Sequence, residues 1–207
     1  MSEINPFDVC RQQPLLIVIS GPSGVGKDAV IHAMEDHGLI FHFVITTTTR
    51  EIRPGEKDGQ DYWFVSRDEF ERMIAQDELL EYNFVYEEYK GIPKSQIRQA
   101  MVSGRDVILR IDVQGAARIR ELQPQAVMIF LTVRDEEELE QRLLTRKTET
   151  EEKLKKRIET ARQEMLRVHE FDYVIENKDG KLDETVAAIG AILCAEHHRV
   201  NPRKVTL

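Results

Sequence analysis

The chain has 207 residues, of which 41% are hydrophobic, so it can bury one good core that carries small inserted subdomains. Its formal net charge of −8 argues against a nucleic-acid or membrane surface as the main partner, and we expect its basic groups to be concentrated in a pocket. No apolar run reaches the ~18 residues that a membrane span needs.

The cysteines and the N-terminus bear on the compartment. Two cysteines, Cys10 and Cys194, indicate a reducing environment and no disulfide framework. The first residues, Met1-Ser-Glu-Ile-Asn-Pro-Phe-Asp8, form neither a basic-then-apolar signal peptide nor an arginine-rich transit peptide. We therefore expect a cytoplasmic protein, although a mature protein of an organellar stroma or matrix would look the same.

Residues 14–37 predict a buried strand, a glycine-rich loop and a helix that stops at Gly38. The loop, Gly21-Pro-Ser-Gly-Val-Gly26-Lys27, has the spacing of a P-loop up to its last position. Glycines let backbone N–H groups turn toward phosphate oxygens, where a Cβ would block them. The helix N-terminus adds partial positive charge and Lys27 a full one, so we predict a phosphate site.

Asp28 departs from the P-loop pattern, which has Ser or Thr at this position to offer a hydroxyl to Mg²⁺. One interpretation is a helix-start carboxylate that favours the dipole. The other is a carboxylate that contacts the metal directly or through water. Because a carboxylate beside phosphates is repelled unless a cation intervenes, we favour the metal contact.

A strand beginning at residues 43–45 runs into four threonines and then into Arg50 and Arg53, followed by turn signals. The two arginines are either solvated on a loop or form a clamp for a second phosphate, since a guanidinium fork matches phosphate oxygens at two points.

Residues 62–101 predict alternating short elements. We expect a strand at 62–65, a helix opened by a capping box at Ser66, and a strand at 79–85 with Glu81 in its middle. Glu81 is either an outward-facing charge or an acceptor that points into a cleft. Gly91-Ile-Pro93 breaks the chain, and Pro93 suits the first turn of a helix that runs to about residue 101.

Two further apolar strands are expected at 107–111 and 126–133. Strands separated by helices imply right-handed crossovers and a parallel sheet. Asp112 follows the first of these strands, at the edge where a substrate-binding or Mg²⁺-associated carboxylate belongs.

Residues 135–169 are charged and helical, with Arg142 and Arg146 on one helix face and Arg157 on the next helix. The segment is either a solvated surface or an arginine-bearing lid that closes over a nucleotide. A last strand at 173–175, a turn, an amphipathic helix at 182–198 and a basic, loosely held tail at 199–207 complete the chain.

Together these motifs resemble the guanylate kinase family. The resemblance covers residues 14–197 in the family's order and rests on Gly21 to Lys27, Thr48-Thr-Arg50-x-x-Arg53-Pro-Gly-Glu56, Asp58-Gly-x-Asp-Tyr62-x-Phe-Val-Ser66, Ile111-Asp112-Val-Gln-Gly115 and Arg142-x3-Arg146-x-Thr-Glu-Thr-Glu-Glu152.

The resemblance implies an α/β P-loop nucleoside monophosphate kinase fold, in which helices flank a parallel sheet. The expected core comprises residues 14–45, 94–134 and 170–197, the mixed-sheet GMP-binding insert 46–93 and the helical lid 135–169, with tails at 1–13 and 198–207. The implied reaction transfers the γ-phosphoryl group of ATP to GMP or dGMP, giving ADP and GDP in purine metabolism, with Mg²⁺ as cofactor. Neither nucleic acid nor membrane is an expected partner, and the chain would be a monomer or homodimer.

The resemblance also assigns residue roles. The catalytic set would be Lys27, Arg50, Arg142, Arg146 and Arg157. ATP would bind Gly21, Pro22, Ser23, Gly24, Val25, Gly26, Lys27 and Asp28, the last also the metal contact. GMP would bind Thr46, Arg50, Arg53, Tyr62, Glu81 and Asp112.

Some positions depart from the family's pattern. Lys90 replaces a tyrosine that would touch the GMP phosphate, which it could still reach as a cation, and Ile92 replaces a Ser or Thr. Arg110 stands where an aspartate is common. The combination of Gly26-Lys-Asp28 in the P-loop with Tyr89-Lys-Gly-Ile-Pro93 resembles a sub-branch of plant organellar and some bacterial guanylate kinases, so we interpret the changes as a variant pocket.

Two alternatives stay open. One is a kinase for another acceptor, either a different nucleoside monophosphate or a sugar bisphosphate. Thr46 and Glu81 favour guanine over these acceptors, whereas the altered residues 90–92 argue mildly against it. The other is an inactive module that recognises phosphorylated partners, a class that typically lacks an intact P-loop, whereas this chain has Lys27 and three lid arginines.

Overall fold

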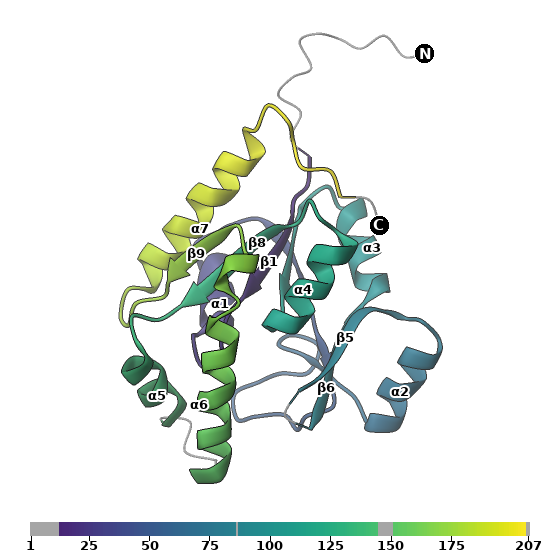
Figure 1. Ribbon diagram of the computed structural model, residues 1–207. Coiled ribbons are helices and arrows are strands. Elements are labelled where there is room, and N and C mark those ends of the chain that lie inside the picture. The colour runs from purple at the N-terminus through teal and green to yellow at the C-terminus, as the bar shows by residue number, and fades with distance from the viewer. Residues whose placement is uncertain (1–12, 86, 145–150, 206–207) are drawn as a thin grey trace, which may run out of the picture.

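A five-stranded parallel sheet forms the centre of the molecule (Figure 1). The computed structural model describes residues 13–85, 87–144 and 151–205. The strands are, in spatial order, β2 (Phe41–Val44), β7 (Asp106–Arg110), β1 (Leu16–Ser20), β8 (Val127–Thr132) and β9 (Tyr173–Glu176), and every neighbouring pair is parallel. The predicted fold class is therefore confirmed.

Helices cover both faces of this sheet, which explains why its central strands β1 and β8 are almost continuous apolar runs. Side chains alternate between the faces: Ile17 of β1 packs in one cluster and its neighbour Val18 in the other. On one side lie α1 (Lys27–Asp36) and α7 (Leu182–His197), and on the other α3 (Lys94–Val102) and α4 (Val113–Leu122). No helix among the described residues is long and apolar enough to cross a membrane.

A second, mixed sheet lies within the segment predicted as the insert. Its order is β4 (Trp63–Phe64), β3 (Thr47–Thr48), β6 (Glu88–Pro93) and β5 (Leu79–Val85); only β3 and β4 pair in parallel. The Ser66 hydroxyl accepts a hydrogen bond from the Glu69 N–H and so caps α2 (Arg67–Ala75), as predicted.

The predicted chain break at residues 91–93 is wrong. These residues complete β6, which is antiparallel to β5, and α3 begins only at Lys94. A Cβ on Gly91 would lie 2.9 Å from the ring of Phe70, so glycine here serves close packing.

Two helices follow β8 (Figure 1). They are α5 (Glu136–Leu144) and α6 (Glu151–Met165), and a 3₁₀ helix (Val168–Glu170) precedes β9. Leu139 and Leu143 of α5 and Ala161 of α6 are buried in the same apolar cluster as α1. Part of the predicted lid segment therefore packs on the core.

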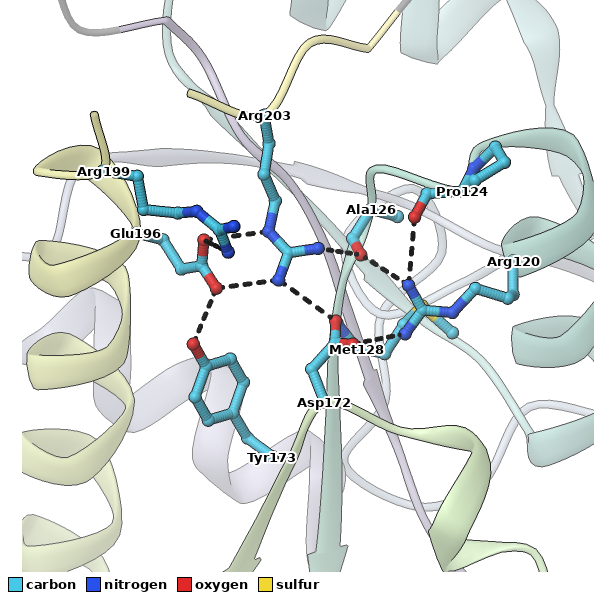
Figure 2. A network of polar contacts seen from close by, with 9 residues as sticks. All are labelled: Arg120, Pro124, Ala126, Met128, Asp172, Tyr173, Glu196, Arg199 and Arg203. Carbon is cyan, nitrogen blue, oxygen red and sulfur yellow. Dashed lines mark hydrogen bonds and ion pairs between the residues drawn. The ribbon is translucent and has the colours of Figure 1, made fainter. Parts of the chain in front are cut away.

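The tail is not loosely held over residues 199–205, contrary to prediction. Figure 2 shows Arg203 pointing at the end of α7, where its guanidinium donates hydrogen bonds of 2.8 Å to both carboxylate oxygens of Glu196. Its third nitrogen donates to the carbonyl of Ala126, and Val205 packs on the apolar cluster under α3 and α4. The tail is held mainly by the charged side chain of Arg203, and a pattern of hydrophobic residues does not reveal such a contact.

Candidate active site

A cavity of about 280 Å³ lies where the P-loop, the small sheet, the end of β7 and α6 meet. Its lining includes twelve of the predicted site residues: Ser23, Gly24, Gly26, Lys27, Asp28, Thr46, Arg50, Arg53, Tyr62, Glu81, Asp112 and Arg157. Of the other predicted site residues, Gly21, Pro22, Val25 and Arg142 do not line it, and Arg146 lies outside the described residues. The cavity thus joins the two groups of residues that the sequence assigns to separate phosphates.

The P-loop is folded so that its glycines avoid steric clashes. Gly21 has a φ of 139°, and a Cβ there would lie 2.1 Å from the carbonyl oxygen of Leu131. The Lys27 ammonium donates to the carbonyls of Gly21 and Pro22, at 2.6 and 3.0 Å. Burial lowers the pKa of Lys27 to about 8. An anion in the loop would compensate for that burial.

Asn177 is a residue that sequence reasoning missed. Its side-chain amide donates to the carbonyl of Val25 at 2.7 Å, and Thr185 in turn donates to its oxygen. Arg142 donates to the same Val25 carbonyl at 3.3 Å, so it supports the loop from outside the cavity. The sequence shows Asn177 only as the first residue of a turn after a strand, which carries no functional signal.

Helix α6 contacts the P-loop at Ser23. Arg157 donates to the Ser23 hydroxyl at 2.6 Å, and Glu164 accepts from the Ser23 N–H at 3.2 Å. Glu164 is buried, which raises its pKa, although the Lys27 ammonium acts in the opposite direction. Sequence reasoning also missed Glu164, because in a helix so rich in glutamate nothing marks the buried one.

The segment that contains Arg50 and Arg53 is held by the carboxylate of Glu56. Glu56 accepts hydrogen bonds of 2.6 and 2.7 Å from both terminal nitrogens of Arg50 and one from the backbone N–H of Arg53. The Arg50 guanidinium also lies 4.7 Å from the centre of the Tyr62 ring. A phosphate can also offer two oxygens to one guanidinium, so the fork is already oriented for an anion.

Glu81 brings a buried polar atom without a partner among the described residues to the cavity. It is 5% exposed, and within residues 13–85, 87–144 and 151–205 its Oε2 has no hydrogen-bond partner. Burial, with the charge of Asp112 as the second cause, raises the pKa of Glu81 to about 8. A Cβ on Gly115 would lie 3.0 Å from the same oxygen, so the start of α4 closes tightly over it. Of the two interpretations of Glu81, the structure favours an acceptor in a cleft.

Asp112 and Thr46 flank this group. Asp112 caps α4 by accepting from the N–H groups of Gln114 and Gly115, both at 2.9 Å. Thr46 is buried and its hydroxyl donates to the carbonyl of Arg110. Both residues are fixed by the backbone of the core strand β7 and the helix after it.

Comparison with known proteins identifies the family. Residues 13–196 match the family model described as guanylate kinase. A guanylate kinase 2, chloroplastic/mitochondrial, from rice is 52% identical over 196 residues, covering 94% of this chain and 69% of its own. The chain belongs to the guanylate kinase family. A guanylate kinase of Latilactobacillus sakei is 45% identical, covering 92% of this chain and 93% of its own. The crystal structure of guanylate kinase from Anaplasma phagocytophilum aligns with a TM-score of 0.75 at 29% identity, over 91% of this chain and 89% of that one.

The positions that depart from the guanylate kinase pattern have different surroundings. Lys90 lines the cavity, whereas Ile92 is fully buried in the apolar cluster under α3 and α4. Asp28 and Arg110 form an ion pair of 2.6 Å. The sequence treats these last two as separate departures from the guanylate kinase pattern, and it gives no sign that they are partners.

Proposed function

We propose that this member of the guanylate kinase family transfers the γ-phosphoryl group of ATP to GMP or dGMP, giving ADP and GDP or dGDP. The observation that carries the proposal is Glu81, which lines the cavity together with Lys27 and Arg50 and whose buried Oε2 has no hydrogen-bond partner among the described residues. Guanine presents an N1–H and a 2-amino group side by side, and one carboxylate accepts from both. Adenine offers no such pair, and a buried acceptor left unpaired costs enough to discriminate by on the order of 10⁴-fold.

The remaining chemistry requires positioning and charge neutralisation, without a covalent intermediate. In this proposal the P-loop N–H groups and Lys27 hold the ATP phosphates. Arg50, Arg53 and Tyr62 hold the phosphate of GMP, and Lys90 adds a cation on the same side. Arg157 neutralises charge from the α6 side, and we assign Arg142 and Arg146 to the same closed site. Phosphate bound at Arg50 would replace Glu56 on its guanidinium.

Mg²⁺ would accompany ATP and would supply positive charge that offsets the charge of the phosphates. Such ions are bound by one or two carboxylates together with substrate phosphates. Among the described residues no group of three or more His, Cys, Asp or Glu side chains could hold a metal ion. The phosphates would therefore supply most ligands, and Asp112 lines the cavity as a carboxylate of suitable chemistry, whereas Asp28 is paired with Arg110. For the compartment we propose the cytosol or an organellar interior.

The first experiment is a coupled ADP-release assay with ATP and Mg²⁺ that offers GMP, dGMP, AMP, CMP and UMP separately at equal concentration. We expect strong turnover with GMP and dGMP alone. Turnover with another monophosphate would mean that the variant pocket has a different specificity. If none of them is turned over, the sugar-phosphate kinase and the binding module become the better interpretations.

The assignment of the P-loop is tested by Lys27→Ala. Loss of the ammonium removes the main positive charge at the β- and γ-phosphates, so we expect kcat to fall by on the order of 10³-fold or more. Circular dichroism and the thermal unfolding midpoint should stay close to those of the wild type. A fully active Lys27→Ala variant would contradict the assignment.

A further inference from the structure

Arg110 and Asp28 meet at the base of the cavity from two different elements. Arg110 is the last residue of β7 and Asp28 lies in the first turn of α1. The distance between Arg110 Nη1 and Asp28 Oδ1 is 2.6 Å. The side chain of Arg110 is 2% exposed, whereas that of Asp28 is 43% exposed, so a buried cation is paired with a carboxylate at the cavity wall.

The other contacts of Arg110 are made with residues just before β4 and with the core strand β2. Its Nη2 donates to the carbonyl of Asp61 at 2.5 Å. The centre of the Tyr62 ring lies 4.3 Å from its guanidinium carbon, and the ring of Phe43 lies 5.1 Å away. Tyr62 therefore lies near two guanidiniums, that of Arg110 and that of Arg50, and one of them belongs to the core strand.

A guanidinium buried to this extent needs a counter-charge. Desolvation of an ion costs several kcal/mol unless a charged partner and hydrogen bonds compensate. Asp28 supplies the charge and the Asp61 carbonyl supplies a hydrogen bond. Loss of the Asp28 charge would thus weaken the position of Arg110, and through it the loop that carries Tyr62.

We propose that Arg110 is a positioning residue for the GMP side of the site and that Asp28 acts as its counter-ion. The pair connects the helix that follows the P-loop with the loop that carries Tyr62. Asp28 then serves the acceptor side even though it lies in the ATP-binding motif. Asp28 Oδ1 lies 2.6 Å from Nη1 of Arg110. The positive charge of this guanidinium repels Mg²⁺ from the same carboxylate.

The test is a double-mutant cycle with Asp28→Asn, Arg110→Gln and the double variant. Because the inference rests on the proposed function, it needs a measurement that requires no substrate. Trp63 follows Tyr62 and is the chain's single tryptophan, so its fluorescence reports on this loop in the ligand-free protein. We expect both single variants to shift the emission or the acrylamide quenching of Trp63 in the same direction, and the double variant to shift it no further.

The second measurement is GMP affinity by calorimetry without ATP or Mg²⁺. We expect about tenfold weaker binding in each single variant and no additional loss in the double variant, since both substitutions break one unit. The KM for GMP should rise more than the KM for ATP, and the Mg²⁺ concentration for half-maximal activity should move less than about twofold. Asp36→Asn, the same change of charge on the exposed end of α1, should alter none of these values.

Several outcomes would overturn the inference. One is an Asp28→Asn variant with wild-type Trp63 fluorescence and GMP affinity but a changed Mg²⁺ dependence, which would make Asp28 a metal contact. Another is a double variant whose loss of GMP affinity equals the sum of the losses in the two single variants. If Arg110→Gln does not fold, Arg110→Lys replaces it, because it keeps the charge and removes the planar fork. A wild type that binds no GMP would refute the proposed function, while the Trp63 cycle would still decide whether the pair positions this loop.

Discussion

Two buried glutamates, one in the cavity and one beneath the C-terminal tail, bind protons very differently. Glu81 is 5% exposed and Glu196 is 1% exposed. Burial raises the pKa of Glu81 to about 8, with Asp112 as the second cause, whereas hydrogen bonds from Arg203 lower the pKa of Glu196 to about 2. Similar burial therefore accompanies opposite pKa shifts, because hydrogen bonds outweigh desolvation at Glu196 only.

The partners of the two carboxylates explain the difference. In the network of Figure 2, Glu196 accepts from Tyr173, from Arg199 and twice from Arg203. Oε2 of Glu81 has no hydrogen-bond partner in the part of the chain that the structure describes. A buried carboxylate whose hydrogen bonds are all made holds structural elements together, and one that lacks them is a place for a ligand to complete. Exposure alone would class the two residues together.

The largest effect should come from Glu81→Gln. The amide presents N–H donors toward the donors of guanine, so we expect kcat/KM for GMP to fall by on the order of 10²-fold. The free energy of unfolding should not fall, because no partner of Glu81 Oε2 is lost. Glu71→Gln, an exposed change on α2, is the matched control. A variant that loses stability but keeps its preference for GMP would give Glu81 a structural role instead.

The opposite behaviour is expected of Arg203→Ala. Removal of this guanidinium takes two hydrogen bonds from Glu196, so we expect urea unfolding to show a loss of about 2 kcal/mol while the kinetic constants stay unchanged. Arg199→Ala is the control: its side chain is 48% exposed and contacts the same carboxylate at 3.2 Å, so it should cost less than ~0.5 kcal/mol. Equal losses of stability in Arg203→Ala and Arg199→Ala would contradict the prediction that Arg203 is the main partner of Glu196.

The pH dependence of this loss follows from the sign of the shift. Because the pKa of Glu196 is lowered from 4.5 to about 2 in the folded protein, its contribution to stability is complete above pH 4.5. That contribution is lost as the pH falls from 4.5 toward 2. The difference in stability between the wild type and Arg203→Ala should therefore shrink over this acid range and stay constant at neutral pH.

The sequence predicts the parts of this site that are local in the chain. The P-loop spacing and the Arg50–Arg53 segment each lie within a few residues, and hydrophobic runs predict the central sheet. Strand β6 was missed because Gly91 and Pro93 are typical of a turn, whereas pairing with β5 overrides that preference. The ion pairs of Asp28 and Glu196 join residues that are distant in sequence or lie in a tail, and in a chain that is 32% charged, composition does not select one partner among many.

The smallest predicted effect is the pH dependence of GMP binding, and it tests the Glu81 side of the comparison. Its pKa is raised from 4.5 to about 8 in the folded protein, so the stability that this proton contributes is present below pH 4.5 and is lost as the pH rises through 8. GMP needs the carboxylate, and its binding must therefore release the proton. We expect the affinity for GMP to rise about tenfold per pH unit below that pKa.

Calorimetry in buffers of different ionisation enthalpy measures the released proton. Glu81→Gln shares the titration of the GMP phosphate but lacks the carboxyl group, so the difference between the two proteins isolates this residue. Parallel pH profiles would mean that Glu81 is already ionised before GMP binds.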